Sequence, residues 1–207
     1  MSLTVSVIGT GYLGATHAAA MAELGFDVIG VDTDEQKIKS LANGDLPFYE
    51  PGLPELLRKH IASGRLTFTT ELETAAEAAD VHFVAVGTPQ RAGDTGADLT
   101  YVDAAVAGLT RLIKRAALII GKSTVPVGTA RRLQAMVKEL SAPGLSIDLA
   151  WNPEFLREGF AVEDTLRPDR LVFGVDSPAA EELLRTIYAD AISRSTPVIT
   201  TDFETSE

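Results

Sequence analysis

Three glycines near the N-terminus have the spacing of a phosphate-binding turn. They are Gly9, Gly11 and Gly14 of the segment GTGYLG, which follows an apolar run and precedes an alanine-rich one. Glycines at this spacing allow a tight turn, a close approach of backbone to pyrophosphate, and close packing of a helix on a strand. The first helical turn, with Tyr12 and Leu13, would then offer free N–H groups and a partial positive charge to the phosphates of a dinucleotide.

An acidic residue follows where the second strand should end. Asp32 can accept hydrogen bonds from the ribose hydroxyls of an adenine dinucleotide. Thr33 and Asp34 come next, with no arginine beside them, so a 2′-phosphate would meet two carboxylates. The pattern therefore predicts NAD, rather than NADP, as the cofactor. Lys37 could reach the ribose or phosphate region, and the alternative interpretation is a lysine on a helix surface.

The elements that must position these residues alternate in type along the chain. Apolar runs of strand length occur at 4–9, 27–32, 66–69, 81–86, 117–122, 147–151, 170–175 and 197–201. Helical patterns lie between them, at 12–24, 34–42, 71–79, 101–114, 129–140 and 178–188. This alternation predicts an α/β fold, a doubly wound and mostly parallel sheet of the Rossmann NAD-binding type with helices on both faces. We place this domain at 1–200 and the start of a connecting helix at 201–207.

Composition excludes several classes of protein. Lys and Arg total 18 against 29 Asp and Glu, and the net charge of −11 disfavours nucleic acid and anionic membranes as partners. There is no cysteine, which excludes a disulfide scaffold, a thiolate zinc site and a cysteine nucleophile within this sequence. His17, His60 and His82 lack the spacing of metal ligands, so no metal is expected. Without a signal peptide or a long apolar run, the chain is expected to be cytoplasmic.

Four further segments carry a family resemblance. They are VDTDEQKIKSLANGDLPFYEPGLPELL from Val31, VGTPQ from Val86 with GADLTYVDAA downstream, KSTVPVGT from Lys122, and NPEFLREG from Asn152 leading into DTLRPDRLVFG. Together they resemble the N-terminal part of the UDP-glucose 6-dehydrogenase family (the UDP-glucose/GDP-mannose dehydrogenases), and the resemblance covers essentially all 207 residues. KSTVPVGT and NPEFLREG are its most specific signals.

The resemblance implies NAD-dependent oxidation of UDP-glucose at C6 to UDP-glucuronate, by two hydride transfers through a cysteine-bound intermediate. In the family, a catalytic Cys and a catalytic Lys lie in a helical middle segment and beyond, and this sequence stops before them. We therefore expect the chain to supply the NAD site and part of the active site of a longer, homodimeric enzyme. Alone it should be inactive.

The resemblance also implies roles for individual residues. Thr88 and Thr124 match positions beside the nicotinamide, where the alternative is a capping or turn hydroxyl. Thr124 and Glu154 resemble residues that position or activate water, and Glu158 resembles one near both nicotinamide and sugar. If this segment is helical, the two acids, four residues apart, share one face of the helix. The alternative is a solvated pair, with Glu154 bound to Arg157.

Three neighbouring residues complete the implied substrate site. Together with Glu154, the residues Phe155, Leu156 and Arg157 fall where the family cradles the UDP-sugar, partly through backbone groups. Trp151, just before this segment, is expected in the core. His17 is expected to be a packed or surface histidine rather than a catalyst.

Other dehydrogenases remain alternatives. Val127 and the Phe-Leu-Arg-Glu run favour the glucose member, but oxidation of UDP-N-acetylmannosamine or GDP-mannose stays open. A small 3-hydroxyacid dehydrogenase would share the glycine turn without explaining NPEFLREG. A non-catalytic NAD-binding module is the alternative from a different class.

Overall fold

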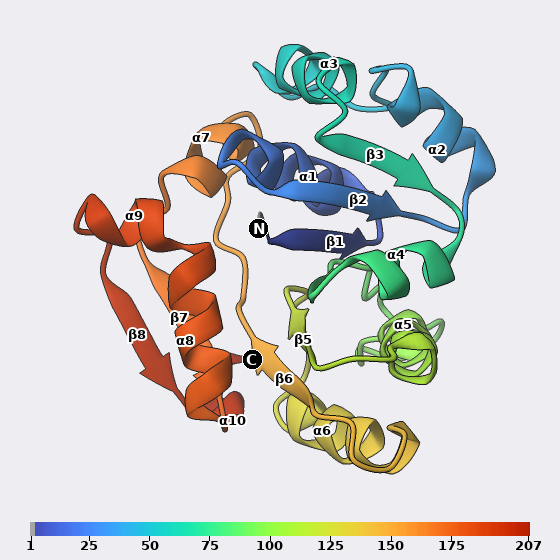
Figure 1. Cartoon of the computed structure of the whole chain (residues 1–207), viewed down its shortest axis with the longest axis vertical. Helices are drawn as coiled ribbons and strands as arrows, with labels where there is room; N and C mark the ends of the chain where they lie inside the picture. The colour runs from blue at the N-terminus through green and yellow to red at the C-terminus, as the bar shows by residue number, and fades with distance from the viewer. Residues whose placement is uncertain (1–2) are drawn as a thin grey trace.

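The structure, a computed structural model, describes residues 3–207. A single β-sheet runs through this part of the chain. Its eight strands lie in the order β3-β2-β1-β4-β5-β6-β7-β8 (Figure 1). They are β1 Thr4–Ile8, β2 Asp27–Val31, β3 Leu66–Thr69, β4 Val81–Val84, β5 Ala117–Gly121, β6 Ile147–Trp151, β7 Leu171–Val175 and β8 Val198–Thr201. Neighbouring strands are parallel except for β6 and β7. The predicted doubly wound, mostly parallel sheet is confirmed.

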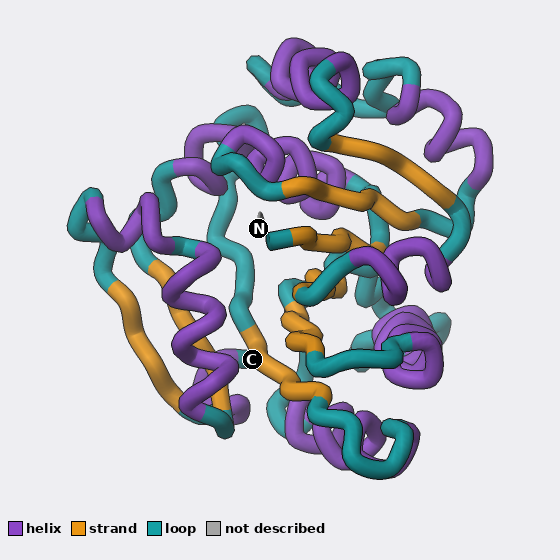
Figure 2. The backbone as a smooth tube through the Cα atoms, in the orientation of Figure 1, coloured by secondary structure: helices purple, strands orange, loops and turns teal. Residues whose placement is uncertain are grey.

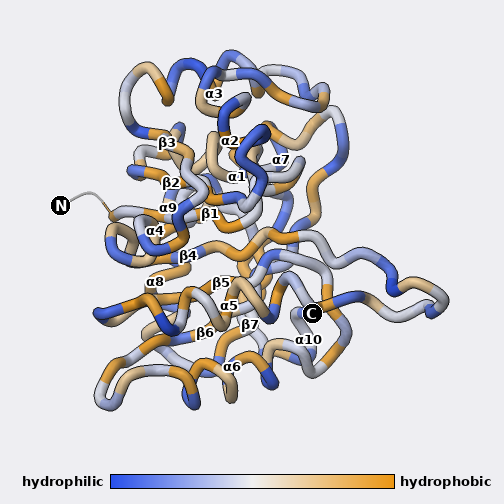
Figure 3. Tube along the Cα trace, turned by 90° about the vertical axis from the view of Figure 1, so that its right-hand side faces the viewer, coloured by the Kyte–Doolittle hydropathy of each residue, from blue (hydrophilic) through white to orange (hydrophobic). Residues whose placement is uncertain are grey.

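Helices cover both faces of this sheet (Figure 2). They are α1 Tyr12–Glu23, α2 Glu35–Ala42, α3 Leu53–Ala62, α4 Leu72–Ala78, α5 Thr100–Leu112, α6 Thr129–Leu140, α7 Ala161–Leu166, α8 Pro178–Ile187, α9 Ala189–Ser193 and α10 Phe203–Ser206. One buried apolar cluster joins the strands to α1, α3, α8 and α9, and the other joins them to α4, α5, α6 and α10. Because both faces are covered, the central strands are largely apolar, and hydrophobic residues recur along β4 and β5 in Figure 3; the buried His82 is the polar residue of β4.

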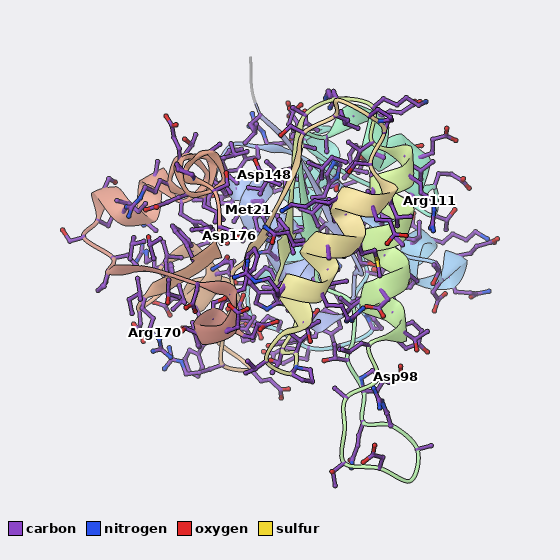
Figure 4. The ribbon with its side chains drawn as sticks, turned by 90° about the horizontal axis from the view of Figure 1, so that it is seen from below. Met21, Asp98, Arg111, Asp148, Arg170 and Asp176 are labelled. Atoms are coloured by element: carbon purple, nitrogen blue, oxygen red, sulfur yellow. The ribbon has the colours of Figure 1, made fainter. Side chains whose placement is uncertain are left out.

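Three helices of the structure were not predicted. α3 has a local signal, because Leu53 and Leu57 recur at helical spacing and are buried. α7 and α9 are only 6 and 5 residues long, too short for a periodic pattern. The loop before α5 projects from the body beside Asp98 (Figure 4) and is closed by a bridge between Gln90 and Ala97.

Strands β5 and β6 pack closely at their carboxyl ends. Trp151 is 1% exposed, which confirms its expected place in the core. Its ring lies over the backbone of Gly121, where an added Cβ would come within 2.1 Å of a ring carbon. Among residues 3–207, no helix has the length and apolar character needed to cross a bilayer.

Replacing Gly121 by Ala should destabilise the fold by ~1–3 kcal/mol, because the Trp151 ring must move out of a close-packed site. Urea unfolding measures the loss. Gly87→Ala is the matched control, since no atom lies within 4 Å of an added Cβ there. Equal unfolding free energies for the two variants would contradict the packing described.

Candidate functional site

The candidate site lies where parallel strands end together. The turns after β1, β4 and β5, and the segment after β6, meet at the carboxyl edge of the sheet. The strand order reverses between β1 and β4, so the crevice that binds ligands in open α/β sheets falls at this point. The glycine turn, both threonines and the NPEFLREG segment are thereby brought to one edge.

The glycine turn, residues 9–14, holds α1 directly against the end of β1. Gly9 adopts φ +90°, and an added Cβ at Gly14 would lie 1.8 Å from the Gly9 carbonyl oxygen. Gly11 precedes the helix without a side-chain cap, and nothing lies within 4 Å of its Cβ position. The turn therefore leaves the helix N-terminus, with Tyr12 and Leu13, open to an anion.

Asp32 lies beside this turn in a network of donors. Its Oδ2 accepts from the N–H of Thr10 at 2.9 Å, from the Thr10 hydroxyl at 3.1 Å and from Lys37 Nζ at 2.9 Å. Its Oδ1 accepts from the N–H of Asp34 at 3.1 Å. Burial alone would raise the pKa of Asp32, but these bonds, led by Lys37, lower it. Asp32 is therefore an ionised acceptor, and Lys37 is its partner rather than a free surface lysine.

A cleft of about 750 Å³ opens above these groups, large enough to bind a sizeable ligand. Its lining includes Gly9, Gly11, Asp32, Lys37 and Thr88. Apolar atoms from β1, α4 and α5 form much of the remaining wall. Five of the residues predicted to bind the cofactor therefore face one cavity.

Thr124 lies next to this cleft rather than in its lining. It is exposed at the end of β5, and its carbonyl oxygen accepts a hydrogen bond from the Thr88 hydroxyl at 2.9 Å. Thr88 therefore acts as a turn hydroxyl in this structure, while the Thr124 hydroxyl remains at the surface of the same edge.

The segment from Asn152 to Gly159, which we call the acid loop, is not helical. The condition under which Glu154 and Glu158 would share one helix face is therefore not met. Pro153 removes one backbone donor, and Gly159 turns the chain at φ +83°. The two acids consequently have different neighbours.

Glu154 faces a buried lysine. Its Oε2 lies 3.3 Å from Lys122 Nζ, and its Oε1 accepts from the N–H of Phe155 at 2.8 Å. Lys122 is 4% exposed and also donates to Asn152 Oδ1 at 3.1 Å, to which the Tyr188 hydroxyl donates at 2.6 Å. Burial would lower the pKa of Lys122, but Tyr188 and Glu154 raise it overall, so the ammonium stays charged.

Sequence reasoning missed Lys122 as a functional residue, although its signal was present. A lysine that directly ends an apolar strand must bury its charge or find a partner. Arg157, the partner considered for Glu154, instead binds Asp164 at 2.7 Å. Within the described residues, no group of three or more His, Cys, Asp or Glu side chains could hold a metal ion.

Glu158 is exposed at the other end of the acid loop. Burial and Glu50 raise the pKa of the Tyr12 hydroxyl, at the start of α1, to about 12. The Glu158 carboxylate lies close enough to Tyr12 to add to this rise. The acid loop therefore runs from the end of β6 to the glycine turn.

A second, small cavity of about 80 Å³ lies under the acid loop, between Glu154, Phe155, Arg157 and Lys122. Phe155 is 45% exposed, and the Arg170 guanidinium lies 4.0 Å from the centre of its ring. Leu156 is half-buried. Three of the four residues predicted to bind substrate, Glu154, Phe155 and Arg157, therefore line one polar hollow.

His17 closes the inner end of this hollow. It is buried, packs edge-on against Phe83 at 4.4 Å, and neither ring nitrogen has a hydrogen-bond partner among the described residues. Burial and the charge of Lys122 lower its pKa. His17 is thus a neutral, packed histidine.

The glycine turn, Asp32 and the cleft define a Rossmann-type domain that binds a dinucleotide. Residues 3–192 match the model of the UDP-glucose/GDP-mannose dehydrogenase family, NAD binding domain. The chain belongs to this family, and NAD is its cofactor.

Relatives of this chain include proteins named UDP-glucose 6-dehydrogenase. It is 43% identical to the UDP-glucose 6-dehydrogenase of Rhizobium meliloti (strain 1021), over 99% of this chain and 47% of that protein. It is also 43% identical to the UDP-glucose 6-dehydrogenase TuaD of Bacillus subtilis (strain 168), over 98% of this chain and 43% of that protein. The chain thus spans about half the length of the curated relatives it matches.

Solved structures agree with this assignment. A UDP-glucose dehydrogenase from the hyperthermophilic archaeon Pyrobaculum islandicum superimposes with a TM-score of 0.92 at 39% identity, over 100% of this chain and 48% of that one. A GDP-mannose dehydrogenase from Pseudomonas aeruginosa also superimposes with a TM-score of 0.92, at 31% identity, over 99% of this chain and 47% of that one.

Replacing Asp32 by Ser should lower NAD affinity by ~1–3 kcal/mol, because charged hydrogen bonds to ribose are lost. It should also let NADP bind, because Lys37 loses its carboxylate partner and can meet a 2′-phosphate. Calorimetry with both cofactors measures the change. In the double variant Asp32→Ser/Lys37→Ala the gain in NADP binding should disappear. Equal NAD and NADP binding by the unmodified chain would refute this account of selectivity.

Breaking the buried pair by Lys122→Met should cost ~3–5 kcal/mol, because Glu154 loses its cationic partner. The double variant Lys122→Met/Glu154→Gln should be destabilised by less than the sum of the two single variants, as measured by urea unfolding. Lys114→Met is the control, because Lys114 pairs with Glu77 on the open surface and should matter little. Additive losses would show that the two groups are not coupled.

Proposed function

We propose that this chain supplies the NAD site and part of the active site of a UDP-glucose 6-dehydrogenase, which converts UDP-glucose to UDP-glucuronate. The observation that carries the proposal is the acid loop, which reaches from the sheet edge to the glycine turn and brings Glu158 beside Tyr12. The two relatives named above as UDP-glucose 6-dehydrogenases support it.

The residues of the cleft fit NAD. The open helix N-terminus suits the pyrophosphate, Asp32 suits the adenosine ribose, and the far end of the cleft reaches Thr88 at the switch point. When bound, NAD supplies the acceptor for hydride from the sugar C6. The chain's own residues hold the nicotinamide end of NAD and the sugar next to each other.

Glu158 and Thr124 are proposed to act where cofactor and sugar meet. Both side chains are exposed at the carboxyl edge, one from the acid loop and one after β5. Glu158 can accept a hydrogen bond from the sugar or order it against the cofactor, and the Thr124 hydroxyl can hold a water.

Glu154 is proposed to act on water as well. In the structure each of its oxygens has one protein donor, Lys122 or the N–H of Phe155. A carboxylate oxygen has a second lone pair, so each can still accept a hydrogen bond from a water near the substrate. Phe155, Leu156 and Arg157 would then cradle the UDP-sugar above it.

The chemistry of the second oxidation requires a further group. Oxidising an aldehyde to a carboxylate through a covalent intermediate needs a nucleophile such as a thiol, and these 207 residues contain no cysteine. We propose that residues outside this sequence supply the thiol.

A second candidate is oxidation of another nucleotide sugar. The GDP-mannose dehydrogenase from Pseudomonas aeruginosa superimposes as well as the UDP-glucose dehydrogenase, with a TM-score of 0.92 in both cases. The shared domain therefore fits either substrate class, and the assay must compare sugars.

The 207-residue chain should bind NAD and fail to form two NADH for each UDP-glucose, because it has no thiol for the second oxidation. A longer chain, extended to the length of the relatives, should form two NADH for each UDP-glucose and few from UDP-N-acetylmannosamine or GDP-mannose. NADH absorbance measures all of these reactions. In the longer chain Glu158→Gln should slow oxidation strongly, whereas Glu163→Gln, on the exposed side of α7, should not. Sustained formation of two NADH for each UDP-glucose by the 207 residues alone, or a preference for another sugar, would refute the proposal.

A further inference from the structure

A buried carboxylate outside the site described so far connects three distant segments. Glu50, in the LPFYEPG segment, is 1% exposed. Its Oε2 accepts from the Tyr12 hydroxyl and from the N–H of Gly159 at 2.9 Å. Its Oε1 accepts from the N–H groups of Ala161 at 2.8 Å and Val162 at 3.4 Å. We call this arrangement the Glu50 clamp.

Neutral donors alone satisfy this carboxylate. Within residues 3–207, no Lys, Arg or His side chain forms an ion pair with Glu50. An ionised carboxyl can be buried in this way only when several hydrogen bonds replace its water. The four donors are therefore fixed relative to one another, because moving any of them away leaves a buried charge short of a partner.

The clamp joins the glycine turn to the far end of the acid loop. Tyr12 is the first residue of α1, and its hydroxyl also accepts from the N–H of Gly159 at 3.2 Å. Its ring packs edge-on against Phe48, 5.0 Å away, which comes from the same segment as Glu50. Figure 1 shows α7, which begins at Ala161, lying alongside α1. The cofactor side and the substrate side of the site meet at this point.

The clamp acts on the residue next to Glu158. Gly159 has φ +83°, a conformation that side chains rarely adopt. Its N–H is held by both Glu50 and Tyr12, so the peptide that links Glu158 to Gly159 has a fixed orientation. Glu158 itself is exposed, so its position follows from the peptide that the clamp holds.

We propose that Glu50 is a positioning residue: it locks the acid loop onto the glycine turn and thereby sets Glu158 at the nicotinamide end of bound NAD. The placement of the nicotinamide rests on the proposed function. The segment LPFYEPG thus has a role in orienting the cofactor although none of its side chains reaches the cleft lining.

The test compares NADH with ADP-ribose, which is the same cofactor without its nicotinamide. In the 207-residue chain, Glu50→Gln should weaken NADH binding by about tenfold, because Glu158 is then no longer held in place for a charged hydrogen bond to the nicotinamide half. ADP-ribose affinity should stay within about twofold, because Asp32 and the glycines still hold that half. The fluorescence of bound NADH should also change, since it reports on the nicotinamide environment. Glu163→Gln, which removes a neighbouring exposed charge, should alter neither ligand.

Tyr12→Phe is the second variant, because it removes one donor and keeps the carboxylate and its three backbone partners. Tyr12→Phe should also weaken NADH binding and leave ADP-ribose binding unchanged, with a smaller loss of NADH affinity than Glu50→Gln causes. This variant decides the test if Glu50→Gln does not fold. Unchanged binding of both ligands, or parallel losses that follow the melting temperature, would overturn the positioning role. Failure of the unmodified chain to bind ADP-ribose would instead overturn the cofactor site, and this inference with it.

Discussion

The contact between Gly14 and the carbonyl of Gly9 controls the geometry of the whole site. An added Cβ at Gly14 would lie 1.8 Å from that oxygen, so any side chain would push α1 away from β1. The contact brings the helix N-terminus to the sheet edge, where its free N–H groups can meet phosphates. It also places Tyr12 within reach of Glu50 and Gly159. One close approach of backbone to backbone therefore sets both the cofactor cleft and the anchoring of the acid loop.

An acidic protein can build an anion site because local donors outweigh net charge. The chain carries −11, yet the carboxyl groups of Asp32, in the cleft, and Glu50, beside the start of α1, already have hydrogen-bond donors. Asp32 is bound by Thr10, Lys37 and a backbone N–H, and Glu50 is bound by a hydroxyl and three backbone N–H groups. Such carboxylates repel a phosphate less than free ones, while the uncapped start of α1 attracts it.

The sequence allows prediction of those features whose causes are local. The strands and the glycine turn are predictable because apolar runs and glycine spacing lie within a few residues. Helix α3 also has a local signal, the helical spacing of Leu53 and Leu57, but it was not predicted. The start of α7 is different, because Glu50, 111 residues away, accepts from its N–H groups. The pairing of Glu154 with Lys122 is likewise a product of β5 and β6 lying side by side, and no spacing within NPEFLREG reveals it.

The different neighbours of Glu154 and Glu158 follow from the shape of the chain between them. Four residues of helix advance about 6 Å and return a side chain to the same face, whereas four extended residues reach ~13 Å. The acid loop is non-helical, so one acid can stay with the buried ammonium at the end of β5 while the other arrives at α1. If the segment were helical, Glu154 and Glu158 would both lie on one side of the crevice. The open loop instead runs from the end of β6 to the start of α1, and it therefore gives the two carboxylates separate surroundings at the carboxyl edge of the sheet.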